Sequence, residues 1–227
     1  MCGRYVARVE AALERDWHLI RHVPPFESFN VAPTQSVPVV RHVPQGNELV
    51  LLRWGLIPFF AKGVPPAYST INARIETVQT AASYRGPWKR GQRCAVIVSG
   101  FYEWQVQADG KTKQPFYIHL NDQETFAFAG LWESSRNEAG DAIESCTHIT
   151  LPANELLAEI HNAKQRMPAI LAAEDRETWL CGTPEQAWSV LKPYPAMRMV
   201  AWPVSTRVNR PANNDATLIL PVDVPKT

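Results

Sequence analysis

The spacing of apolar residues divides the chain into one amphipathic segment near its start and a long series of short extended runs. Residues 7–20 (ARVEAALERDWHLI) carry apolar side chains at helical intervals, which predicts an amphipathic helix. The runs that follow are rich in β-branched and aromatic residues, a pattern typical of strands. These runs are 37–40, 48–54, 94–98, 101–106, 115–120, 125–132 and 147–151.

Turn and cap signals organise the second half of the chain. The runs 101–106 and 115–120 flank the Asp-Gly pair at 109–110, which supplies the positive φ of a tight turn, so we expect a hairpin. Thr183 followed by Pro184 is typical of a helix start, because threonine caps the first turn and proline fits its first position. Helices are expected at 153–159, 174–181 and 184–191.

The remaining segments complete the predicted architecture. Residues 55–70 (GLIPFFAKGVPPAYST) form a long proline-containing connection, and loops of this length in compact domains are often functional. The C-terminal part from about Pro203 is expected to be extended. Together these features predict a single α+β domain with a mostly antiparallel sheet. The domain is expected to span residues 1–227, with 222–227 as a short tail.

Composition and charge narrow the functional classes. The chain is 45% hydrophobic and 20% charged, as in ordinary globular proteins. Residues 1–20 lack the apolar h-region of a signal peptide, and no apolar run approaches the roughly 20 residues that a membrane span needs. We therefore expect a cytoplasmic protein without a membrane partner. A net charge of +1 means that any nucleic-acid site must come from local clusters. The four cysteines have no paired spacing, which favours free thiols over disulfides or a zinc site, so no metal is expected.

Position 2 carries the most unusual candidate chemistry. Methionine before a small residue is usually removed, which would leave Cys2 with a free α-amine beside its thiol. An α-amine titrates at about pH 7.7–8, so a useful fraction is neutral at pH 7. Such an aminothiol condenses with an aldehyde, first as a Schiff base and then as a thiazolidine ring closed by the thiol. From its position alone, however, an incidental cysteine is the alternative.

Segments along almost the whole chain resemble the SOS-response-associated peptidase family, in the family's order. They are MCGRY at 1–5, FNVAPTQ at 29–35, RWGLIP at 53–58, INARIET at 71–77, RCAVIVSGFYEWQ at 93–105, PFYIHL at 115–120, IHNAKQRMPAIL at 160–171 and PVSTRVNRPANNDATLI at 203–219. The resemblance implies a β-barrel-like core with flanking helices and a groove for single-stranded DNA that ends at the N-terminus. It also implies covalent capture of the ring-opened aldehyde of an abasic site as a thiazolidine, which shields the lesion without a cofactor.

The resemblance assigns catalytic roles to four residues. Cys2 is the nucleophile, and Asn72 resembles the asparagine that orients the N-terminal amine and the sugar. Glu103 resembles the acid/base beside the lesion, and its aromatic neighbours would desolvate it and raise its pKa. His161 resembles the histidine that assists ring opening, Schiff-base formation and reversal, although four residues separate it from the RMP that follows, more than in better-known members. A turn asparagine, a solvent-facing glutamate and an ordinary histidine are the alternatives.

Basic and aromatic residues supply the expected DNA contacts. Arg4 and Arg74 match arginines that hold phosphates next to the lesion. The segment 84–93 (YRGPWKRGQR), which includes Arg85, mixes basic and aromatic residues as single-strand-binding surfaces do, although a solvated basic loop is the alternative. Phe60 stands where many relatives place a tryptophan that wedges against the bases. Further expected contacts in matching motifs are Asn30, Pro33 and Thr150.

Three functions are therefore compatible with the sequence. The leading one is a monomeric covalent sensor and shield of abasic sites in single-stranded DNA. The second is a cysteine peptidase that uses Cys2 with Glu103 and His161, with autocatalytic removal of Met1. The third is a non-covalent single-strand-binding module. Only the first yields a protein–DNA species that survives denaturation.

Overall fold

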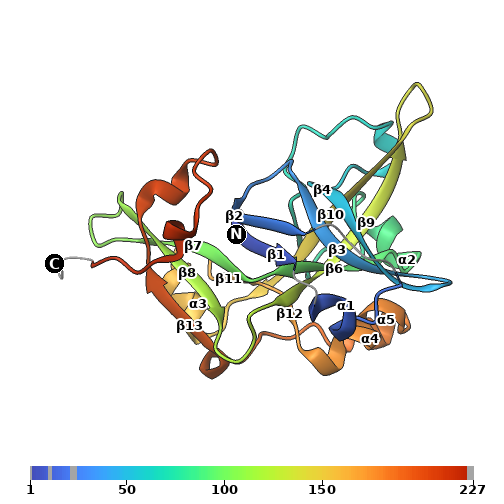
Figure 1. The fold of residues 1–227 in the computed structure, drawn as a ribbon. Helices are drawn as coiled ribbons and strands as arrows, with labels where there is room; N and C mark the ends of the chain where they lie inside the picture. The colour runs from blue at the N-terminus through green and yellow to red at the C-terminus, as the bar shows by residue number, and fades with distance from the viewer. Residues whose placement is uncertain (1, 10–11, 21–24, 224–227) are drawn as a thin grey trace.

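Two sheets form the framework of the protein, and the computed structural model describes residues 2–9, 12–20 and 25–223 (Figure 1). The first sheet has the order β13-β8-β7-β1-β2. Every neighbouring pair in it is antiparallel. Its strands are β1 (Tyr5–Val9), β2 (Phe26–Val31), β7 (Gly100–Val106), β8 (Lys113–Leu120) and β13 (Met199–Pro203).

The second sheet closes on itself as a barrel-like ring. Its order is β11-β10-β4-β3-β6-β9-β12, and an additional pairing of β9 with β10 completes the ring. The short strand β5 pairs with β10 in parallel. The strands are β3 (Ser36–Val43), β4 (Gly46–Trp54), β5 (Asn72–Arg74), β6 (Arg93–Val98), β9 (Phe126–Arg136), β10 (Ala142–Pro152), β11 (Arg166–Pro168) and β12 (Ile170–Leu171).

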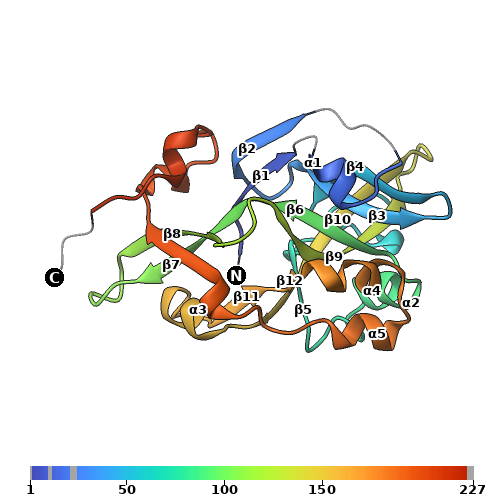
Figure 2. The same ribbon diagram turned by 60° about the horizontal axis from the view of Figure 1, so that its bottom comes forward.

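Short helices cover the ends of this framework. Figure 2 shows α2, α4 and α5 gathered near one end of the second sheet, whereas α3 lies beside β7 and β11. Among the described residues, no helix is long and apolar enough to cross a membrane. The helices are α1 (Ala12–Asp16), α2 (Arg85–Lys89), α3 (Glu155–Ile160), α4 (Arg176–Cys181) and α5 (Pro184–Ser189).

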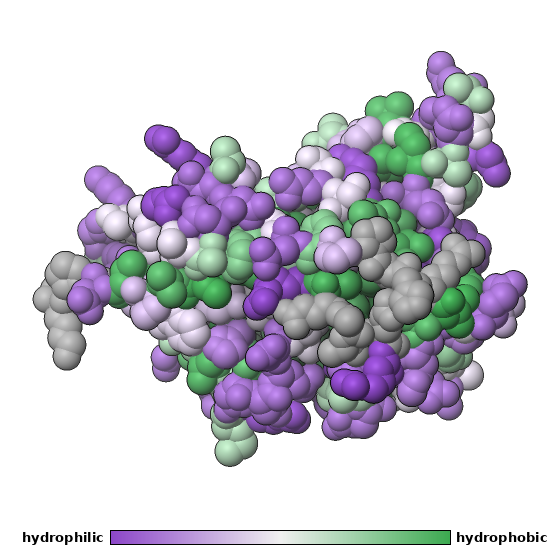
Figure 3. All heavy atoms as spheres, in the orientation of Figure 1, coloured by the Kyte–Doolittle hydropathy of each residue, from purple (hydrophilic) through white to green (hydrophobic). Residues whose placement is uncertain are grey.

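The hydrophobic core fills the space between and inside the sheets. Strand β6 is buried along its whole length because both of its faces are covered, as expected for a central strand. Large aromatic side chains meet edge to face at the centre, where the Tyr5 ring lies 5.0 Å from Trp54 and 6.1 Å from Phe128. On the outside, the face in Figure 3 intersperses hydrophilic and hydrophobic residues.

Most predicted elements are confirmed. Six of the seven predicted strands lie within observed ones, and the run 125–132 starts one residue before β9. The runs 101–106 and 115–120 pair as a hairpin in which Gly110 has a φ of 68°. Thr183 caps α5 with a complete capping box and Pro184 occupies its first position. The predicted single α+β domain with flanking helices is also observed.

Two predictions about the ends of the chain are wrong. Residues 5–9 form β1 rather than the start of a helix, because pairing with β2 and β7 buries both faces of this strand. The helix that follows covers only Ala12–Asp16, and residues 10–11 lie outside the described ones. After Pro203 the chain forms 3₁₀ turns at Thr206–Asn209 and Ala216–Ile219, capped by side chains, instead of staying extended. Residues 224–227 of the expected tail lie outside the described residues.

Candidate functional site

Cys2 lies buried three residues before β1, where the fold brings several polar groups close to it. Its side chain is 1% exposed, and its thiol donates to the Arg4 carbonyl over 3.7 Å. The side-chain amide of Asn72 donates to the Cys2 carbonyl at 3.0 Å. Burial, followed by the nearby charge of Glu103, raises the pKa of the Cys2 thiol well above its usual range. The resting cysteine is therefore a neutral thiol held in a fixed position.

Asn72 is held by the short strand β5. This strand pairs with β10, with His148 opposite Asn72, and the Tyr84 hydroxyl donates to the Asn72 carbonyl at 3.2 Å. The Asn72 side chain is 8% exposed, and its oxygen Oδ1 is buried without a hydrogen-bond partner among the described residues. Since a buried acceptor without a donor is costly, this oxygen is suited to accept from an amine or a sugar hydroxyl.

Glu103 and His161 lie next to each other, and Glu103 is close enough to Cys2 for its charge to act on the thiol. Glu103 projects from β7 and is 2% exposed, and its Oε1 lies 3.8 Å from Nδ1 of His161. Burial raises the pKa of Glu103 to about 7. His161 ends α3, and burial lowers its pKa. The Arg166 carbonyl lies 2.9 Å from Nδ1 of His161; as an acceptor it places the proton of the neutral ring there and leaves Nε2 basic.

A cavity of about 440 Å³ opens onto this pair. Trp104 forms part of its wall, with its indole nitrogen donating to Asn209 at 2.9 Å. Lys164 lies close enough for its charge to lower the pKa of both Glu103 and His161. The lining residues are Glu103, Trp104, Val106, Lys113, His161, Ala163, Lys164 and Asn209.

Sequence reasoning did not identify the lysines or Arg166. Lys164 lies in the long connection between His161 and RMP, whose unusual length was the available signal. Arg166 forms an ion pair with Glu76 and donates to the Thr150 carbonyl at 2.6 Å, while its own carbonyl orients His161. Its place in the RMP motif after His161 was the signal that could have revealed it.

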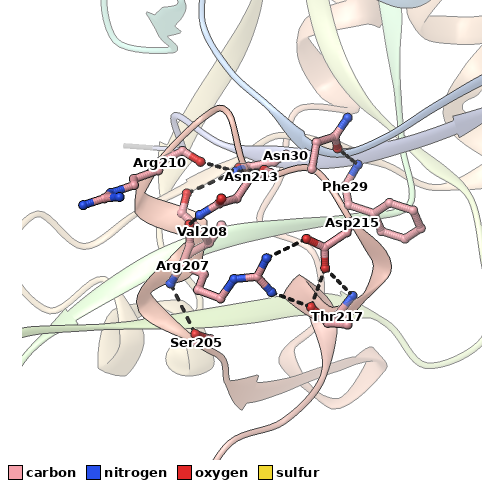
Figure 4. Close-up of polar contacts among 10 residues, drawn as sticks. Phe29, Asn30, Ser205, Arg207, Val208, Arg210, Asn213, Asp215 and Thr217 are labelled. Carbon is pink, nitrogen blue, oxygen red and sulfur yellow. Dashed lines mark hydrogen bonds and ion pairs between the residues drawn. The ribbon is translucent and has the colours of Figure 1, made fainter.

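Asn30 has a structural position that its motif did not reveal. Its side chain is 1% exposed, and its amide nitrogen donates to three carbonyls of the C-terminal loop (Figure 4). The same loop is held by the ion pair of Arg207 with Asp215. The buried Asn30 side chain therefore holds this loop, and its expected contact with DNA stays a prediction. The three carbonyls belong to Val208, Arg210 and Asn213.

Arg4 also holds this loop and keeps its positive charge uncompensated. Its guanidinium donates to Asn30 Oδ1 at 3.0 Å and to the Val208 carbonyl at 2.7 Å. Burial lowers the pKa of Arg4, and no carboxylate among the described residues forms an ion pair with it. Neutral partners orient the guanidinium without neutralising it, so it remains suited to a phosphate.

Replacing Asn30 with alanine should destabilise the folded protein. The change removes a donor from three loop carbonyls and leaves that of Asn213 without a donor among the described residues, and we expect a loss of roughly 1–3 kcal/mol in the free energy of unfolding, measured with urea. The control is Asn137→Ala in the exposed β9–β10 turn, for which we expect less than about 0.5 kcal/mol. Equal stability of both variants would contradict this role of Asn30.

The other expected DNA contacts differ in their accessibility. Arg74, Phe60 and Arg85 are exposed and Pro33 is half-buried. Thr150 is completely buried, with its hydroxyl donating to the Ala73 carbonyl at 3.4 Å, and its expected contact with DNA stays a prediction.

The prediction that 84–93 forms a basic and aromatic binding surface is wrong for its aromatic residues and for Arg93, whereas its other cations are exposed. Tyr84 and Trp88 are buried, because α2 packs them into the core, and so they are not available to stack on bases. Arg90 forms an ion pair with Glu133 at 2.6 Å, and the buried Arg93 donates to backbone carbonyls near the end of α4. Arg85 remains exposed beside Lys89.

The other cysteines are free thiols, and the described residues show no cluster of metal ligands. Cys94 and Cys146 are buried free thiols, and Cys181 is an exposed one. Within residues 2–9, 12–20 and 25–223, no three His, Cys, Asp or Glu side chains converge as metal ligands.

Comparisons with known proteins agree in pointing to one family. The family model of SOS response associated peptidase (SRAP) matches residues 1–211. The chain is 39% identical over 227 residues to abasic site processing protein YoqW of Bacillus subtilis, covering 96% of this chain and 99% of that protein. It is 34% identical over 237 residues to abasic site processing protein HMCES of Gallus gallus, covering 88% of this chain and 68% of that protein.

Solved structures share the fold. A crystal structure of a protein from Bacteroides thetaiotaomicron superposes with a TM-score of 0.77 at 30% identity, covering 86% of this chain and 85% of that one. A protein from Bordetella bronchiseptica gives a TM-score of 0.76 at 28% identity, with 90% and 100% covered.

Proposed function

The chain belongs to the SOS response associated peptidase family, and we propose that it captures abasic sites in single-stranded DNA by covalent attachment to Cys2. The relatives named above are abasic site processing proteins, which supports abasic DNA as the substrate. The main support from this chain is the convergence of Cys2, Asn72, Glu103 and His161, which come from different elements of the fold. This cluster is complete within one chain, in keeping with a monomer.

The proposed reaction begins at the amine of Cys2 after removal of Met1. The neutral amine attacks the aldehyde carbon of the ring-opened sugar, and the resulting carbinolamine loses water to give a Schiff base. Glu103 protonates the departing hydroxyl, and His161 accepts the proton that the amine loses. The thiol then adds to the Schiff-base carbon, and its proton passes to the nitrogen. A thiazolidine forms with loss of one water and without any oxidant or cofactor.

The state of the Cys2 thiol favours this order over a peptidase mechanism. A cysteine peptidase uses a thiolate, which needs a lowered pKa. Here burial and Glu103 raise the pKa of the thiol, so the thiolate is scarce before the substrate binds. The amine-first route needs only a neutral thiol that reacts after the Schiff base has formed.

The DNA is proposed to approach along the half-buried Arg4, the exposed Arg74 and the apolar connection 55–70. Arg4 and Arg74 would hold phosphates, and Phe59 and Phe60, which are 58% and 50% exposed, offer faces for base stacking. The preference for single strands has a physical reason, since extruding a nucleotide from a duplex costs a few kcal/mol.

Crosslinking to matched single-stranded and duplex abasic oligonucleotides tests this proposal. We expect a denaturation-resistant band that forms rapidly with the single strand and at least roughly tenfold more slowly with the duplex, because the lesion must first be extruded. An undamaged strand of the same sequence is the control. Equal rates on the two substrates would contradict a single-strand groove, and absence of the band from both would contradict covalent capture.

Arg74→Ala should weaken the dependence of DNA binding on salt. Each phosphate contact contributes about −0.7 to the slope of log affinity against log salt for single strands, so losing one contact should make the slope shallower by about that amount. The measurement is binding of a single strand that carries a reduced, uncrosslinkable abasic analogue. Arg136→Ala, which removes an exposed charge at the end of β9, should leave the slope unchanged. An unaltered slope in Arg74→Ala would remove this residue from the groove.

A further inference from the structure

His148 is a buried histidine that the reaction described above does not use. It lies in the middle of β10 and is completely buried. The alternation along the strand puts it on the same face as Thr150. Its ring packs between aromatic side chains, with centroid distances of 5.4 Å to Trp54 and 5.2 Å to Phe128. An apolar side chain of similar size would fill this position without burying polar atoms. The buried imidazole nitrogens therefore suggest a role beyond packing.

The pairing of β5 with β10 brings His148 next to the residue that holds Cys2. The register of β5 with β10 sets His148 directly opposite Asn72, whose amide holds the Cys2 carbonyl. The Cys2 backbone lies close enough to the imidazole to oppose the lowering of its pKa. Neither ring nitrogen has a hydrogen bond of ordinary geometry in the part of the chain that the structure describes. Asn72 on β5 and His148 on β10 are therefore paired residues that both lie near the backbone of Cys2.

The imidazole stays neutral in this environment. Burial lowers the pKa of His148 to about 3, and the contact with the Cys2 backbone opposes the shift only partly. A neutral imidazole has one N–H donor and one acceptor nitrogen. The ring can therefore bond to the Cys2 backbone without bringing a charge into the core and without changing state between pH 5 and 9.

We propose that His148 is a positioning residue for Cys2, which fixes the Cys2 backbone together with Asn72 so that the amine and the thiol are both presented to one aldehyde carbon. The inference rests on the proposed function. Ring closure requires the thiol to reach the carbon that the amine has just attacked, so a backbone that pivots would separate the two steps. Aromatic packing on one side and a polar contact on the other suit an imidazole to this position.

The test compares His148→Phe with His148→Asn in protein whose Met1 removal is confirmed by mass. Phenylalanine keeps the aromatic packing and loses the nitrogens, whereas asparagine keeps a donor. At saturating single-stranded abasic DNA we expect His148→Phe to crosslink roughly 10- to 100-fold more slowly, because small displacements of reacting groups are costly. We expect His148→Asn to recover most of the rate, and both variants to bind a reduced abasic analogue with wild-type affinity.

A matched control separates positioning from a general loss of packing. Ile149→Val removes one buried methylene group from the next residue of β10, which faces the other side of the strand. It should crosslink at the wild-type rate. If the rates of His148→Phe, His148→Asn and Ile149→Val simply follow their melting temperatures, the role is structural and the proposal is overturned. A wild-type rate in folded His148→Phe would also overturn it.

Two further measurements separate positioning by His148 from a failure to bind DNA and from a role in proton transfer. Condensation of Cys2 with the small aldehyde glyoxylate, followed by mass, should slow in His148→Phe even if wild-type protein fails to crosslink DNA. That failure would then count against the proposed function alone. The dependence of the crosslinking rate on pH should keep its shape in His148→Asn, since the imidazole does not titrate. Loss of an inflection between pH 5 and 9 would mean that His148 transfers protons, and would contradict positioning.

Discussion

A protein that retains one residue before Cys2 should form no stable crosslink with abasic DNA, although its thiol is intact. The extra residue converts the α-amine into an amide, which is not nucleophilic toward an aldehyde, so the first step cannot occur. We expect a loss of at least roughly 10³-fold, down to the background of the assay, because covalent catalysis depends on this nucleophile. The measurement is a denaturing gel of tagged protein, verified as intact by mass, beside protein that begins at Cys2.

The complementary change is Cys2→Ser in protein from which Met1 has been removed. This variant keeps a primary α-amine that titrates at about pH 8 and still condenses with the aldehyde. It should form an adduct that borohydride traps, while the stable untrapped crosslink is lost because no thiol closes the ring. A peptidase that depends on the thiol alone predicts the reverse pattern, with activity that survives the tag and disappears in the serine variant.

Glu103→Gln should give the second large effect, slowing crosslinking by roughly 10²- to 10⁴-fold, the range of general acid–base catalysis. With a pKa raised to about 7 by burial, Glu103 supplies both protonation states near neutral pH. The wild-type rate should therefore show an inflection near pH 7 that is absent in the glutamine variant. Single-turnover rates from pH 5 to 9 provide the measurement.

Glu103→Gln should slow crosslinking but stabilise the folded protein at alkaline pH. Because the pKa of Glu103 is higher in the folded protein than its ordinary value, the folded state binds more protons between these two values. Burying the ionised carboxylate then makes wild-type stability fall as the pH rises toward 7. Glu103→Gln removes this cost, so at pH 8 the variant should be the more stable protein, by up to roughly 3 kcal/mol.

Glu133→Gln is a matched control for removing a buried carboxylate. Glu133 is 3% exposed and forms an ion pair with Arg90, away from the cavity that contains Glu103. Its replacement should lower stability and leave the crosslinking rate and its inflection in place. If both variants lose rate equally, or if Glu103→Gln reacts at the wild-type rate, Glu103 is not the acid in this reaction.

The parts of the fold that depend on local chemistry were predictable from the sequence. The Asp-Gly turn specifies the β7–β8 hairpin, and the Thr183-Pro184 pair specifies the start of α5, because both signals act within a few residues. Segment 7–20 failed because its helical spacing was outweighed by pairing with β2 and β7, which are distant in sequence. Tertiary pairing of this kind leaves no local signal.

The candidate site shows the same division between local and distant information. Motifs located Cys2, Asn72, Glu103 and His161, and their catalytic roles remain predictions. The motifs did not distinguish residues on the surface of the site from buried residues that hold the fold, since the side chains of Asn30 and Thr150 are buried. His148 was missed because its relation to Cys2 exists only through the register of β5 with β10.

The sequence of 84–93 illustrates why composition alone misleads. Alternating basic and aromatic residues are equally compatible with a binding surface and with a helix that buries its aromatic side. The chain adopts the second arrangement, because Trp88 packs near Trp179 on α4 and Tyr84 bonds to the backbone of Asn72. This choice depends on partners that lie far away in the sequence.

The mass of the intact product tests covalent capture by Cys2 most directly. Wild-type protein without Met1 is incubated with a single-stranded abasic oligonucleotide, denatured and weighed. We predict a species equal to protein plus oligonucleotide minus one water, with fragmentation that places the oligonucleotide on Cys2, and no such species with the reduced abasic analogue. A product without the linkage to Cys2, or only unmodified protein after complete incubation, would contradict the account.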